Sequence, residues 1–117
     1  MKNRLKLEEK KCVPCIGGIQ PMKKDDALKY LKSLNGWDIV NNMKIKKSFK
    51  FSNFKETMDF VNKVADTAEH EGHHPDICLY YGKADITLWT HKIKGLHEND
   101  FIMAAKIDRI AKSFYMG

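Results

Sequence analysis

The chain has 117 residues, 43% of them hydrophobic and 31% charged, which is typical of one soluble domain with a modest core. Its formal net charge is +6, but the basic residues are mostly scattered lysines, a pattern that argues against bidentate recognition of nucleic acid. No apolar run approaches the length of a membrane span, and the first residues lack the apolar stretch of a secretory signal. A cytoplasmic protein is therefore expected, with a nuclear location left open.

Residues 1–21 are predicted to form an irregular N-terminal arm, because they lack apolar periodicity and contain glycine and proline. Cys12 and Cys15 in this arm have the C-x-x-C spacing of half a zinc site or of a redox pair. No second such pair follows, so a flexible segment with two reduced thiols is the preferred interpretation. A zinc site shared with histidines is the minor alternative. Residues 22–117 are predicted to form a single domain.

Two elements are predicted directly after the arm. Residues 25–34 read as a short helix, with leucines at helical spacing and a stop at Asn35-Gly36. Residues 37–51 read as a β-hairpin. A three-residue loop would place Ile39 opposite Ile45 and avoid pairing apolar residues with lysines.

The longest helix is predicted to begin after Asn53 and to end at Gly72. Asn53 is a favoured N-cap residue, and Glu56 three residues later completes a capping box. The apolar stripe of this helix is predicted to be Phe54, Met58, Val61, Val64, Ala65 and Ala68. A final helix after Gly95-Leu96 is predicted to bury Met103, Ala104, Ile107, Ile110, Ala111 and Phe114.

Histidines cluster where the longest helix stops. Imidazole suits proton transfer or metal binding because its unperturbed pKa lies near neutral pH. His73 and His74 are followed by Pro75, which restricts His74 to an extended conformation. His70 lies in the last helical turn, where a cation is favoured, and is left outside the predicted site.

A second hairpin is predicted from residues 76–81 and 84–91, joined by Gly82-Lys83 as a type II′ turn. The register that follows places His74 opposite His91, on the polar face at the end away from the turn. The opposite, apolar face of this hairpin is predicted to contain Ile77, Leu79, Ile86 and Leu88.

The order α-β-β-α-β-β-α predicts an α+β fold, with a four-stranded antiparallel sheet and helices packed on one face. The helices are expected to cover the apolar hairpin face and to leave the histidine face open. An open face and unpaired strand edges favour oligomerisation.

Three motifs occur in the order His73-His74-Pro75-Asp76-Ile77, Thr90-His91 and Gly95-Leu96-x-Glu98-x-Asp100. In residues and spacing they resemble the pterin-4a-carbinolamine dehydratase family, and the resemblance extends from about Pro21 to Phe114. It implies a hydro-lyase that converts 4a-hydroxytetrahydrobiopterin into quinonoid dihydrobiopterin, a step of tetrahydrobiopterin recycling. It also implies that the pterin is the substrate, that no metal or redox cofactor is required, and that the protein is a homodimer or homotetramer.

The resemblance assigns catalysis to His73, His74 and His91, with Glu69 as an accompanying acidic residue. Further candidates for binding or orienting the substrate are Pro75, Asp76, Trp89 and Thr90. Trp89 is suited either to stacking on a flat pterin or to packing. One departure is His97, which stands where relatives commonly have Ser or Thr as a helix cap, so the tightness of that helix start is in question.

Two rival functions remain. The first is a non-catalytic dimeric adaptor of the transcription-cofactor kind, in which the histidines would be inherited from an enzyme and have no catalytic role. The second is a metal-binding protein that uses the three histidines, with or without Cys12 and Cys15. The metal reading is disfavoured because successive side chains diverge along a strand, so adjacent histidines rarely reach one ion.

Overall fold

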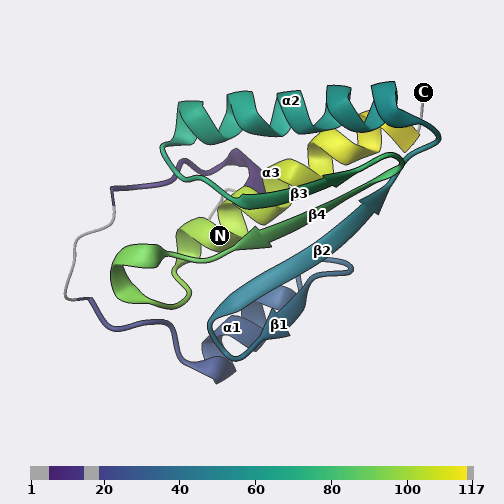
Figure 1. The fold of residues 1–117 in the computed structure, drawn as a ribbon. Coiled ribbons are helices and arrows are strands. Elements are labelled where there is room, and N and C mark those ends of the chain that lie inside the picture. The colour runs from purple at the N-terminus through teal and green to yellow at the C-terminus, as the bar shows by residue number, and fades with distance from the viewer. Residues whose placement is uncertain (1–5, 15–18, 116–117) are drawn as a thin grey trace.

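The computed structural model describes residues 6–14 and 19–115. Its elements in chain order are η1 (Leu7–Glu9), α1 (Lys24–Leu31), β1 (Asp38–Val40), β2 (Lys44–Lys50), α2 (Phe54–Glu71), β3 (Asp76–Tyr80), β4 (Lys83–Leu88), η2 (His91–Ile93) and α3 (Glu98–Tyr115). Cys15 and Gly17-Gly18 lie outside the described residues. The predicted α+β class and element order are confirmed (Figure 1). In the described part of the chain, no helix has the length and apolar character needed to cross a membrane.

The four strands form one sheet in the order β1-β2-β4-β3, and each neighbouring pair is antiparallel. The first hairpin has the predicted register, with Ile39 opposite Ile45. Its loop contains Asn41 and Asn42, both with a φ of 54°, a left-handed conformation that asparagine tolerates better than most residues. The long β2–β4 pairing at the centre of the sheet supports β3 as an edge strand.

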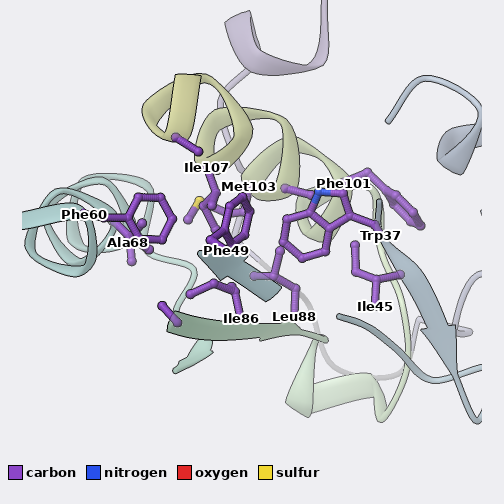
Figure 2. Packing of buried hydrophobic residues seen from close by; sticks show 14 of the residues in the cluster. Trp37, Ile45, Phe49, Phe60, Ala68, Ile86, Leu88, Phe101, Met103 and Ile107 are labelled. Atoms are coloured by element: carbon purple, nitrogen blue, oxygen red, sulfur yellow. The ribbon is translucent and has the colours of Figure 1, made fainter. Parts of the chain in front are cut away.

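The helices cover one face of the sheet and enclose the core with it. Figure 2 shows side chains of α2 and α3 converging on those of the central strands. The strands contribute Ile45, Phe49, Ala84, Ile86 and Leu88, and the helices contribute Phe60, Val64, Ala68, Met103 and Ile107. Each fully buried large apolar side chain contributes roughly 1.5–3 kcal/mol to the stability of the fold. Burial in this layer therefore stabilises the sheet and the loops at its ends.

The longest helix begins as predicted but turns a different face inward. Asn53 Oδ1 accepts a hydrogen bond from the Glu56 amide at 2.8 Å, which confirms the N-cap. The predicted stripe is wrong in part, because Phe54 and Ala65 are exposed while Thr57 and Phe60 are fully buried. α2 carries apolar residues on two neighbouring faces, and helical spacing alone does not say which of them meets the sheet.

The predicted register of the second hairpin is wrong by two residues. Ile77 pairs with Ile86 and Tyr80 pairs with Lys83, so the turn consists of Tyr81 and Gly82. A shift of two residues keeps every side chain on its side of the sheet, so the four predicted apolar residues still share one face. Ile86 and Leu88 are fully buried there, but Leu79 on the edge strand is exposed. The predicted pairing of His74 with His91 does not survive.

Contacts outside the hairpin account for the observed turn. The Thr57 hydroxyl donates to the Tyr81 carbonyl at 2.9 Å, and the Phe51 amide donates to the Gly82 carbonyl at 2.9 Å. A Cβ on Gly82 would lie 3.0 Å from the Phe51 carbonyl oxygen, so this close approach favours glycine. The turn is therefore selected by Phe51, directly after β2, and by Thr57 of α2, which a local turn rule does not consider.

Candidate active site

A hollow of about 570 Å³ lies at the end of the β3–β4 hairpin opposite the turn. It is lined by Pro14, Gly72, His73, His74, Pro75, Asp76, Trp89, Thr90, His91 and Lys92. The structure thus brings together the three predicted catalytic histidines and four of the predicted orienting residues. Glu69 does not line the hollow, but its carboxylate reaches His74 from the end of α2.

His73 is held by a buried carboxylate. Its Nε2 lies 2.6 Å from Asp100 Oδ1, and the side chains of His73 and Asp100 are 11% and 0% exposed. An ionised carboxylate can only accept hydrogen bonds, so Nε2 carries the proton in this pair. Nδ1 is then the ring nitrogen that can exchange a proton with a ligand.

Asp100 also organises the surroundings of His73. Its second oxygen, Oδ2, accepts from the Thr90 hydroxyl at 2.8 Å and from the His97 amide at 3.0 Å. The carboxylate therefore joins the loop before β3, the residue before His91 and the first turn of α3. Three donors around one buried carboxylate make a rigid support, because a buried polar network of this kind is satisfied only in one arrangement.

His74 is paired in a more exposed setting. Its Nε2 lies 2.5 Å from Glu69 Oε2, and the two side chains are 60% and 78% exposed. Pro75 restricts the backbone of His74, so its direction depends on the chain as well as on the carboxylate. Exposed ion pairs contribute about 0–1 kcal/mol, so Glu69 orients His74 only weakly.

His91 lies beyond the end of β4, as the first residue of η2, instead of opposite His74. Its ring packs against Trp89 with ring centroids 4.0 Å apart and an interplanar angle of 35°. Trp89 Nε1 donates to Asp76 Oδ2 at 3.2 Å, and the Lys44 ammonium lies 4.6 Å from the Trp89 ring centroid. Asp76 thus orients Trp89, and Trp89 supports His91.

The loop that carries His91 is closed on itself. Thr90 and Gly95 exchange two backbone hydrogen bonds, of 2.8 and 3.3 Å. A Cβ on Gly95 would lie 2.5 Å from Pro21 Cβ, so only glycine allows this segment to sit against the chain before α1. This closure fixes the position of η2 relative to α3.

Sequence reasoning missed two residues near the site. The position of Asp100 was visible in the motif Gly95-Leu96-x-Glu98-x-Asp100, but its contact with His73 spans 27 residues and had no local signal. Pro14 lines the hollow from the arm, where no pattern predicted a contact. His97 does cap its helix, because its Nδ1 accepts from the Asn99 amide at 3.0 Å. The start of α3 is therefore closed despite the unusual residue.

Cys12 is half-buried, and its Sγ lies 3.7 Å from the Asn99 carbonyl oxygen. Burial, followed by the negative charge of Glu71, raises the pKa of its thiol to about 12. A neutral thiol is a poor nucleophile and a poor metal ligand. Within residues 6–14 and 19–115, no three histidine, cysteine, aspartate or glutamate side chains are arranged to hold a metal ion, and Cys15 lies outside that range.

Residues 20–110 match the family described as pterin 4 alpha carbinolamine dehydratase. The chain belongs to this family. A Rubrobacter xylanophilus protein provisionally named pterin-4-alpha-carbinolamine dehydratase is 50% identical over 104 residues, which cover 89% of this chain and 97% of that protein. An Alkaliphilus metalliredigens protein with the same provisional name is 47% identical over 104 residues, covering 88% of this chain and 94% of that protein.

Solved structures give the same family with more varied descriptions. A transcriptional coactivator/pterin dehydratase from Brucella melitensis superposes with a TM-score of 0.75 at 34% identity, covering 79% of this chain and 99% of that one. A pterin dehydratase-like protein described as a RuBisCO assembly factor in the alpha-carboxysome superposes with a TM-score of 0.57 at 25% identity. That match covers 66% of this chain and 90% of the other. The fold of the family is thus found under both enzymatic and non-enzymatic descriptions.

Proposed function

We propose that the protein is a hydro-lyase that dehydrates 4a-hydroxytetrahydrobiopterin to quinonoid dihydrobiopterin. The observation that carries this proposal is the grouping of His73, His74 and His91 around one hollow, two of them paired with carboxylates. The hollow, at about 570 Å³, lies within the range of roughly 300–1,000 Å³ usual for small-molecule sites. Membership of the dehydratase family supports the same reaction.

The reaction needs only proton transfers and the cleavage of one carbon–oxygen bond. One acid delivers a proton to the 4a-hydroxyl, which leaves as water. One base removes the proton from the adjacent ring nitrogen. The electron pair of that N–H bond then forms the new carbon–nitrogen double bond. Histidine can serve as either group near neutral pH, and positioned proton transfer typically contributes 10²–10⁴-fold. The proposed chemistry therefore uses no metal or redox cofactor.

The supporting residues have separate tasks in this proposal. His73 and His74 each turn Nε2 toward a carboxylate and keep Nδ1 for proton exchange. Trp89 holds His91 by ring contact and is itself tied to Asp76. Thr90 is bound to Asp100, which places the start of the His91 loop relative to His73.

The decisive experiment is a direct assay of carbinolamine dehydration with purified full-length protein. The carbinolamine is generated by a pterin-dependent hydroxylase, and its decay is followed with and without the protein. We expect the wild-type protein to accelerate the decay and a His74→Ala, His91→Ala double variant to lose most of that acceleration. A wild-type rate equal to the uncatalysed background would contradict the proposed activity.

A non-catalytic adaptor is the second candidate, because a coactivator and an assembly factor occur among the similar structures. It would fold and assemble normally but leave the rate of carbinolamine decay unchanged. The same assay therefore separates the two candidates.

We also propose that the protein forms a homodimer or homotetramer. β3 is an edge strand, and large apolar residues are exposed on it, on the following turn and at the start of α2: Leu79, Tyr80, Tyr81 and Phe54. Unpaired strand edges and exposed apolar patches favour association with another chain. Light scattering at micromolar concentration measures the mass directly, and a clean monomer would contradict the proposal. The arm before Pro21 should be dispensable for assembly.

A further inference from the structure

The N-terminal arm is hydrogen-bonded to the protein body beside the candidate site. Val13 donates its amide to Asn99 Oδ1 at 3.0 Å and accepts from Asn99 Nδ2 at 2.7 Å. The Asn99 side chain is buried and thus pairs with the Val13 backbone as a neighbouring strand would. This two-point contact fixes both the position and the direction of the chain at Val13.

A second contact lies one residue earlier. The Cys12 amide donates to Glu71 Oε1 at 2.8 Å, while Glu71 Oε2 lies 3.6 Å from the Lys106 ammonium. Lys106 in turn donates to the Glu8 carbonyl at 2.9 Å. Burial raises the pKa of Glu71, but the Cys12 amide, Lys106 and His70 outweigh this effect and hold that pKa below its ordinary value. Glu71 is therefore a carboxylate at neutral pH. It can accept from the Cys12 amide and can also pair with Lys106, which binds the Glu8 carbonyl.

Both anchors lie within two residues of groups that build the candidate site. Asn99 directly precedes Asp100, which holds His73, and Glu71 lies two residues before His73. Pro14 directly follows Val13, and it lines the hollow together with the histidines. The described arm residues 6–14 therefore run beside α3 and bring Pro14 to the hollow (Figure 1, purple segment beside α3).

We propose that Pro14 forms a substrate-binding wall of the site, and that Asn99 and Glu71 are positioning residues that hold it there through their contacts with Val13 and Cys12. This inference rests on the proposed function, because it names the side of the hollow against which the pterin binds. Pro14 presents a rigid apolar ring, suited to the face or edge of a flat bicyclic ligand. Among the described residues, the hydrogen bonds of Val13 go to Asn99 and not to His73, so the wall should affect ligand binding more than proton transfer.

The test compares three variants of the full-length protein. Asn99→Ala removes the contact to Val13, Pro14→Gly removes the wall side chain, and Lys11→Ala is a matched control at an exposed arm position. Affinity for 7,8-dihydrobiopterin is measured by equilibrium dialysis, and kcat and KM are measured for carbinolamine dehydration. Circular dichroism verifies folding, and Pro14→Gly alone carries the test if Asn99→Ala does not fold.

We expect Asn99→Ala and Pro14→Gly to raise both the pterin Kd and KM about fivefold or more while kcat stays within about twofold, the signature of lost uniform binding. Lys11→Ala should match the wild-type protein. Unchanged Kd and KM in both variants, or a fall in kcat at constant KM, would overturn the role of the arm while leaving the proposed function intact. A wild-type protein that neither binds nor dehydrates the pterin would overturn both.

Discussion

The two histidine–carboxylate pairs have nearly the same length but different surroundings. His73 and Asp100 are 2.6 Å apart and almost inaccessible to water, whereas His74 and Glu69 are 2.5 Å apart and largely exposed. Asp100 also receives two further hydrogen bonds, from Thr90 and His97. A short distance therefore does not measure what a pair contributes. Burial and the number of other donors decide whether the carboxylate fixes its histidine or only accompanies it.

The largest effect should come from Asp100→Asn. Hydrogen bonds to a charged group contribute roughly 1.5–3 kcal/mol each, and at least two would be weakened, so we expect a loss of roughly 3 kcal/mol or more in unfolding free energy. Turnover should also fall about 10²-fold or more, because His73 loses its fixed orientation. Urea unfolding and the dehydration assay measure the two effects. A stable and active variant would show that the buried carboxylate is not the support we infer.

Replacement of His74 or His91 by Ala should separate activity from stability. If each histidine takes part in proton transfer, turnover should fall roughly 10²–10⁴-fold, limited by the uncatalysed rate of dehydration. Both side chains are exposed, so the unfolding free energy should change little. The measurement is steady-state turnover alongside a urea melt. Unchanged turnover in both single variants would refute the assigned roles.

Glu69→Gln tests the difference between the two pairs, because it makes at the exposed pair the same change that Asp100→Asn makes at the buried one. We expect the unfolding free energy to change by about 0–1 kcal/mol, since exposed pairs are screened by solvent. Turnover should fall by less than about tenfold, because Pro75 still restricts the His74 backbone. An effect as large as that of Asp100→Asn, measured in the same two assays, would remove the distinction between the pairs.

The smallest effect is expected for His70→Gln. His70 is exposed in the last turn of α2 and lies outside the hollow. A cation at a helix end contributes about 0.3–1 kcal/mol at most, and less when the imidazole is neutral. Turnover should change by less than about threefold, within the range of a surface substitution. A loss comparable to that of His74→Ala would mean that the site extends one helical turn further than the structure indicates.

The sequence was sufficient for the fold class, because the fold class depends on local patterns. Helical and strand periodicities predicted the element order. The histidines predicted to be catalytic do line one hollow, and their catalytic roles stay a prediction. The hairpin register was predicted wrongly because Thr57 and Phe51, distant in sequence, decide where the turn falls. The predicted His74–His91 pairing depended on that register and was wrong with it.

The remaining features also depend on contacts between distant segments. Asp100 was recognisable as part of a motif, but only the packing of α3 shows that it faces His73. The hydrogen bond between Val13 and Asn99 joins residues 86 positions apart, and no periodicity in the arm predicts it. Side chains that fix other side chains are harder to predict than those that carry the chemistry, because their role exists only in the folded chain.

The buried Asp100 carboxylate has two structural roles. It accepts from the His97 amide at the first turn of α3, and it also binds His73. Helix ends open locally at a lower free energy than the whole domain unfolds. Fraying of this one turn would release His73 while the sheet and the core remain intact. Heating should therefore inactivate the protein below the temperature at which its helical signal is lost. Substitutions that strengthen the start of α3 should raise the inactivation temperature more than the melting temperature.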